Sequence, residues 1–144
     1  VVEITKEGTD VTLVTYGSTW RIVMEAAKEL EAYSIYVEVI DVQSLIPFDV
    51  NHDIVQSIAK TNRVIFVDED VPGGATAYMM QKVVEDQKAY YHLDSDPRTL
   101  TAKPHRTAYG SDGDYFSKPC IGDVFEKVYD LMNELDPKKY TRIF

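Results

Sequence analysis

Three short polar segments carry residue types that can bind ions. Gly17-Ser18 follows a β-branched, apolar run, at a position where the N-terminus of a helix can bind an anion. The carboxylates of Asp68-Glu69-Asp70 stand before Pro72-Gly73-Gly74 and offer oxygen ligands for a divalent cation. Ser111-Asp112-Gly113-Asp114 partly matches a calcium-binding loop. Each segment is therefore a candidate site.

None of these segments is a complete motif. The further glycines and the lysine of phosphate-binding loops are missing around Gly17, so a tight turn followed by a Ser18 helix cap is favoured. No histidine or loop spacing supports a metal at residues 68–70, whose charges suit a helix dipole. Residues 110–114 lack the calcium-loop spacing and also the strand–helix context of a thiamine diphosphate motif. They are predicted to form an ordered surface loop.

The histidines and the cysteine do not supply an active site either. His52, His92 and His105 are far apart and fall on different expected elements, without a second ligand at metal-binding spacing. Cys120 follows a proline at the start of a helix, where a thiol can be activated, but a structural role is favoured. We predict no catalytic, cofactor-binding or metal-ligating residue in this chain.

The elements that position these residues alternate between strand and helix. Apolar and β-branched runs predict the strands, and apolar residues three or four apart predict the helices. Strands are expected at 11–16, 35–41, 63–68 and 98–102; helices at 19–33, from 49 or 51 to 60, from 75 to 90, and at 121–135; and a long loop at 103–119. This alternation predicts one three-layer α/β/α domain over residues 1–144, with a mostly parallel sheet.

Composition restricts the class of protein. The apolar fraction of 44% and the charged fraction of 27% are ordinary for a globular chain and argue against disorder. No apolar run is long enough for a transmembrane helix. The net charge of -9 argues against nucleic acid and favours a basic protein partner. A single cysteine fits a reducing compartment, so we expect a cytoplasmic location. Because the chain opens on Val1, it is interpreted as a fragment of a longer polypeptide.

Several segments, taken in order, match one family. They are Glu7 to Ser18, Ala26 to Leu30, Val37 to Asp41, Ser44-Leu45, Pro47 to Asp49, Lys60-Thr61, Val67 to Glu69 and Gly73-Gly74. Their spacing resembles the C-terminal domain of the transketolase-like thiamine diphosphate enzymes. The resemblance is closest to the β-type half, or a fused α/β form, of the first component of 2-oxo acid dehydrogenase complexes. Two departures are Gln43, where the family has Arg, and a longer segment at 104–119.

The resemblance implies both a topology and a division of labour. It implies a five-stranded mixed sheet of order 1-3-2-4-5, with Val1 to Ile4 as an antiparallel edge strand. Thiamine diphosphate and Mg would be bound by other domains of the full-length enzyme. This domain would contribute contacts in a homodimer or heterotetramer, and a docking surface for the basic peripheral domain of the acyltransferase component.

The last predicted helix supplies the candidate docking residues. Asp123, Glu126 and Asp130 stand three and four apart, so they share a solvent face opposite the apolar stripe. The terminal carboxylate at Phe144 adds a further negative charge. We predict that these four residues dock a partner; a merely solvated helix face is the competing interpretation.

The resulting functional hypothesis is a structural and assembly domain of a thiamine diphosphate-dependent 2-oxo acid dehydrogenase, inactive by itself. The full-length enzyme would decarboxylate a 2-oxo acid oxidatively and transfer the acyl group to lipoyl groups; 2-oxoisovalerate is one substrate among several. One alternative is the C-terminal domain of a transketolase or deoxyxylulose-phosphate synthase. Another is a stand-alone nucleotide- or flavin-binding module, which the lack of a phosphate loop disfavours.

Overall fold

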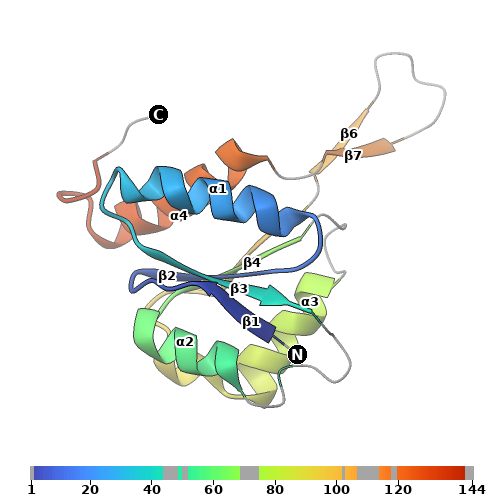
Figure 1. The fold of residues 1–144 in the computed structure, drawn as a ribbon, viewed down its shortest axis with the longest axis vertical. Coiled ribbons are helices and arrows are strands. Elements are labelled where there is room, and N and C mark those ends of the chain that lie inside the picture. The colour runs from blue at the N-terminus through green and yellow to red at the C-terminus, as the bar shows by residue number, and fades with distance from the viewer. Residues whose placement is uncertain are drawn as a thin grey trace.

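A five-stranded sheet of order β1-β3-β2-β4-β5 forms the centre of the computed structural model (Figure 1). The structure describes residues 2–43, 49, 52–68, 75–101, 103–106, 114–117 and 120–141. The strands are β1 (Val2–Lys6), β2 (Val11–Thr15), β3 (Val37–Val42), β4 (Val64–Val67) and β5 (Arg98–Leu100). β1 pairs antiparallel with β3, whereas the other pairings are parallel. The predicted strand order and the antiparallel edge strand are confirmed.

Helices cover both faces of this sheet, as the alternating pattern predicts. In Figure 1, α1 (Thr19–Glu31) and α4 (Ile121–Leu135) lie on one face, and α2 (Asp53–Thr61) and α3 (Ala75–Met80) lie on the other. The three-layer α/β/α architecture is therefore confirmed. None of the helices among the described residues is long and apolar enough to cross a membrane.

The predicted continuous helix from 75 to 90 is wrong. After α3 the chain forms a π-helix, η1 (Gln81–Asp86), and then a 3-10 helix, η2 (Ala89–His92). The wider winding is visible in the bond from Gln87 N–H to the Lys82 carbonyl at 2.9 Å. Lys88 then adopts a left-handed backbone with φ of 59°, which ends helical winding before η2. Apolar periodicity does not report such a break.

The predicted long loop at 103–119 is also wrong in part. It contains two strands, β6 (Lys103–Arg106) and β7 (Asp114–Ser117), which pair antiparallel in a separate two-stranded sheet. Pro104 lies opposite Phe116 in this register. A proline disfavours a strand prediction because it cannot donate to a ladder, yet an isolated hairpin consists only of edge strands, where proline is tolerated.

Two apolar clusters fill the space between the sheet and its helices. β2 is buried along its whole length, and its successive residues Leu13 and Val14 belong to opposite clusters, as a period of two requires. The apolar stripe of α4 is confirmed for Val128 and Leu131, which are fully buried. Leu135, predicted to belong to this stripe, is instead 36% exposed, because α4 ends at that residue.

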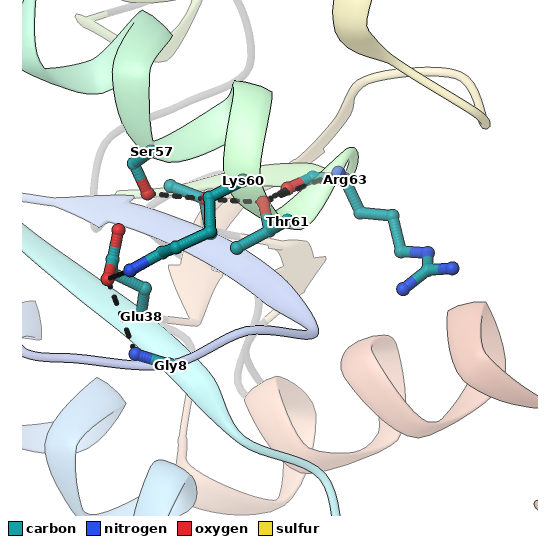
Figure 2. Close-up of polar contacts among 7 residues, drawn as sticks. Gly8, Glu38, Ser57, Lys60, Thr61 and Arg63 are labelled. Carbon is teal, nitrogen blue, oxygen red and sulfur yellow. Dashed lines mark hydrogen bonds and ion pairs between the residues drawn. The ribbon is translucent and has the colours of Figure 1, made fainter.

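A buried carboxylate joins three segments on one side of the sheet. The Glu38 side chain on β3 is 1% exposed and forms an ion pair with Lys60 of α2, which is 45% exposed (Figure 2). The Gly8 N–H donates to Glu38 Oε1 at 3.3 Å. A Cβ on residue 8 would lie 2.3 Å from the Val37 carbonyl carbon, so only glycine allows this approach. The ion pair thus ties α2 to β3 and to the β1–β2 turn.

A cluster of hydroxyl groups fixes α2 to the neighbouring strand. The Thr12 Oγ1 of β2 lies 2.7 Å from both the Ser57 Oγ and the Thr61 Oγ1 of α2. Thr61 also donates to the Arg63 carbonyl at 3.0 Å, at the entry to β4 (Figure 2). All three hydroxyls are buried, and mutual hydrogen bonding offsets their desolvation.

Removing the Lys60 ammonium group should leave the buried Glu38 carboxylate without a compensating charge. We expect Lys60→Met to lower the free energy of unfolding by about 3 kcal/mol, since breaking a buried pair leaves an uncompensated charge. The double variant Glu38→Gln/Lys60→Met should lose less, because the amide is neutral and can still accept from Gly8. Urea unfolding measures both, with the exposed Lys28→Met as control. Equal losses in the single and double variants would contradict this account.

The edge strand carries a cross-strand pair of like charges. Glu3 of β1 lies opposite Asp41 of β3, and Gln43 Nε2 donates to Glu3 Oε2 at 2.9 Å. Burial, and then the Glu3 carboxylate, raise the pKa of the Asp41 carboxyl above its ordinary value of 3.8. The Gln43 that replaces the family's Arg therefore binds Glu3 as a neutral donor and leaves the negative charge uncompensated.

Stability should consequently depend on pH through Asp41. An acid with a raised pKa in the folded state contributes stability that is fully present below its unfolded pKa. That contribution is lost as the pH rises through the folded pKa. Relative to the wild type, Asp41→Asn should become progressively more stable as the pH rises from about 3, below the unfolded pKa, through the higher folded pKa. Thermal unfolding across this range tests it, with Glu85→Gln as control; a stability difference independent of pH would refute it.

Candidate docking site on α1 and α4

Three of the four predicted docking residues lie on α4, but they are not equivalent. Asp123 sits in the first turn, where its Oδ2 accepts from the Cys120 N–H at 2.9 Å. Asp123 thereby caps the helix and complements its dipole, and Cys120, which is exposed, precedes the first helical residue. Glu126 is exposed and Asp130 is half-buried. Phe144 lies outside the described residues.

The acidic residue one turn beyond Asp130 has a structural partner. Glu134 Oε2 accepts from the Arg98 guanidinium of β5 at 2.5 Å, and Asp96 lies 3.3 Å from the same nitrogen. The hydrogen bond to Glu134 raises the pKa of Arg98. This ion pair ties α4 to the end of the sheet. The part of the acidic face left for a partner is therefore centred on Glu126.

Glu126 borders a groove that α4 forms with α1. A cavity of about 470 Å³ is lined by Glu29, Ala32, Tyr33, Gly122, Phe125 and Glu126. The Tyr33 and Phe125 rings meet edge to face, with centroids 5.3 Å apart. Phe125, predicted on the buried stripe, is only partly buried because it forms this wall. Among the described residues, neither Glu29 nor Glu126 forms an ion pair.

The aromatic wall is held in place from behind. The Tyr129 ring stacks on Phe125 at 5.9 Å and meets Tyr33 edge to face at 5.7 Å. Its hydroxyl donates to the Thr141 carbonyl at 2.5 Å. Tyr129 is 3% exposed, whereas Tyr33 is 44% exposed. A buried, hydrogen-bonded ring thus supports an exposed one, and the groove surface is preorganised.

Sequence reasoning missed Glu29 and Tyr33. Glu29 lies in the last turn of α1 and Tyr33 two residues beyond its end, and about ninety residues separate them from Phe125 and Glu126. The only signal in the sequence was a tyrosine four residues after a glutamate. Only the packing of α1 against α4, seen in Figure 1, brings the two pairs together.

The predicted turn at Gly17-Ser18 is present and Ser18 stands at the predicted N-cap position, but it does not cap the helix through its side chain. Gly17 has a φ of 64°, which suits glycine, and Ser18 already has helical geometry. Its side chain makes no cap hydrogen bond to α1. Thr19 Oγ1 instead donates to the Tyr16 carbonyl at 2.7 Å and lies 2.7 Å from Thr15 Oγ1. The hydroxyl of Thr19 therefore supplies the hydrogen bond to the backbone carbonyl of this turn.

The other sequence candidates are scattered. Asp68 is buried at the end of β4, and residues 69–74 and 110–113 lie outside the described part. His52 precedes α2, whereas His92 lies in η2 and His105 in β6. No three histidine, cysteine, aspartate or glutamate side chains converge on a metal position within the described residues.

The fold defines a class of protein. Four parallel strands, an antiparallel first strand at the edge and helices on both faces form the α/β architecture of transketolase C-terminal domains. A family model described as "Transketolase, C-terminal domain" matches residues 1–114. The chain belongs to this family.

Curated relatives narrow the comparison. The chain is 35% identical over 139 residues to the pyruvate dehydrogenase E1 component subunit beta of Chlorokybus atmophyticus. It is 39% identical over 103 residues to the acetoin:2,6-dichlorophenolindophenol oxidoreductase subunit beta of Bacillus subtilis (strain 168). These alignments cover 96% and 72% of the chain, but only 41% and 29% of the relatives. The chain thus spans well under half the length of the relatives it matches.

A solved structure supports the same fold. The chain superposes on a split-gene transketolase, described as an inactive β4 tetramer, with a TM-score of 0.66 and 26% identity. The match covers 90% of this chain and 40% of that one.

Proposed function

We propose that this chain is the C-terminal assembly domain of a thiamine diphosphate-dependent 2-oxo acid dehydrogenase. The observation that carries the proposal is its likeness to the subunits named pyruvate dehydrogenase E1 beta, across up to 96% of the chain. The named solved transketolase is less similar, at 26% identity. That structure nevertheless supports a second candidate function, the C-terminal domain of a transketolase.

The described residues do not fit a thiamine diphosphate site. Such a site needs a metal to hold the diphosphate, and no three candidate metal ligands converge in the described part of the chain. One buried carboxylate, that of Glu38, is already paired with Lys60. We infer that thiamine diphosphate and Mg²⁺ are held by other domains of a longer enzyme.

Within that enzyme the chain would act through its surfaces. We propose contacts with the remaining domains in a homodimer or heterotetramer, in the cytoplasm, and docking of the acyltransferase component. The docking residues are Asp123, Glu126, Asp130 and Phe144. A net charge of -9 favours a basic partner, because complementary charge accelerates diffusional encounter. Docking of this kind would hold the acyl acceptor near an active site built elsewhere.

The isolated chain should be catalytically silent. We expect no thiamine diphosphate binding at micromolar cofactor with Mg²⁺ in isothermal calorimetry, and no decarboxylation of pyruvate or 2-oxoisovalerate. The physical reason is that, within the described part of the chain, no three candidate metal ligands converge to hold the diphosphate through a metal. A complete pyruvate dehydrogenase E1 component serves as the positive control. Saturable micromolar binding to the chain alone would overturn the assignment of the cofactor to other domains.

Docking should depend on the charge of α4. We expect Glu126→Lys and Asp130→Lys to weaken binding of the cognate acyltransferase's peripheral domain, and more so at low salt. A desolvated charge pair is worth about 2–5 kcal/mol on truncation, so the affinity should fall at least about tenfold. Asp123→Lys should also destabilise α4, because it removes the cap.

Two controls make this experiment interpretable. Glu85→Lys changes the charge equally, but Glu85 lies on η1, on the opposite face of the sheet. Circular dichroism of every variant separates lost docking from a damaged helix. If the affinity stays within about threefold throughout, α4 does not dock the peripheral domain.

A further inference from the structure

We propose that the groove between α1 and α4 binds one lysine or arginine side chain of a basic polypeptide segment. Its aliphatic stem would lie against the Tyr33 and Phe125 rings, and its charged end between Glu29 and Glu126. This inference rests on the proposed docking function and deepens it. It adds α1 to a site that sequence reasoning placed on α4 alone.

The shape and chemistry of the groove suit such a side chain. A cavity of about 470 Å³ can hold an extended side chain and part of its backbone. Two aromatic rings at a centroid distance of 5.3 Å offer an apolar wall for methylene groups. The exposed Tyr33 ring also offers a negative π-face to a cation.

The charges that line the groove have one sign. Glu29 and Glu126 come from different helices, and among the residues that the structure describes no cation lines the cavity with them. Two other acidic residues of α1 and α4 already have partners: Glu31 pairs with Lys6 at 2.5 Å and Glu134 with Arg98. The two groove carboxylates are thus available to a positively charged partner. An aspartate- or glutamate-rich segment would be repelled.

The arrangement also explains why the rings are exposed. A tyrosine that is 44% exposed and lies next to a partly buried phenylalanine leaves apolar surface in water. Tyr129, buried behind them, prevents both rings from collapsing inward. Covering this surface with the stem of a long basic side chain removes it from water at a small conformational cost to the protein.

A direct test uses a short peptide in which alanine alternates with arginine and lysine. Fluorescence anisotropy should show binding to the 144-residue chain and none for the same peptide with citrulline and acetyl-lysine. Glu29→Gln and Glu126→Gln should each weaken binding about fivefold at low salt. Ala32→Trp fills the groove without changing charge and should abolish binding. Glu85→Gln, an equal charge change on the other face, should leave the affinity unchanged.

The outcomes separate this inference from the proposed function. Wild-type affinity in both Glu29→Gln and Ala32→Trp, or no peptide binding to the wild type, overturns the groove as a binding site. The same variants are then measured with the acyltransferase's peripheral domain. If that domain depends on Asp130 but not on Glu29, the docking proposal stands and the groove inference falls. If the peptide occupies the groove but the peripheral domain does not bind, the proposed partner falls and the groove stands.

Discussion

The packing of α2 and of the β1–β2 turn against β3 depends on one constraint, the burial of the Glu38 carboxylate. An ionised carboxylate inside a protein is tolerated only with compensating charge and hydrogen bonds. Lys60 supplies the charge and the Gly8 N–H supplies a hydrogen bond. These partners come from a helix and a turn that flank two different strands. The requirement therefore constrains where the last turn of α2 lies relative to β3, and how closely the β1–β2 turn approaches it.

The two faces of the sheet are stabilised in different ways. The α2 side is held by the Glu38 ion pair and by the hydroxyl cluster around Thr12, in addition to its apolar core. The α1 and α4 side combines an apolar core with aromatic contacts centred on Tyr129. A polar network requires one specific geometry, whereas the aromatic packing around Tyr129 leaves Tyr33 on the surface. The open aromatic groove accordingly lies on this second face.

Membership of the transketolase C-terminal family is consistent with a domain whose chemistry lies at its surfaces. Several of its buried polar groups have partners inside the domain: Glu38 is paired with Lys60, and Thr12 with Ser57 and Thr61. Groups satisfied in this way position elements and do not offer a reactive atom to a substrate. The unpaired charges of the described part, Glu29 and Glu126 among them, face outward. This distribution supports an assembly role within a longer enzyme.

The sequence alone determined the order of strands and helices. A buried parallel strand is a continuous run of apolar residues, whereas an amphipathic helix has apolar residues three or four positions apart. The motifs of the sequence, through their resemblance to a family, also indicated the topology and the antiparallel edge strand. It did not reveal the π-helix after Met80 or the pairing of residues 103–106 with 114–117, where backbone hydrogen bonding overrides side-chain pattern. Nor could it join Glu29 to Glu126. Side chains about ninety-seven residues apart meet only when two helices pack on one sheet face, and that proximity is a property of tertiary structure.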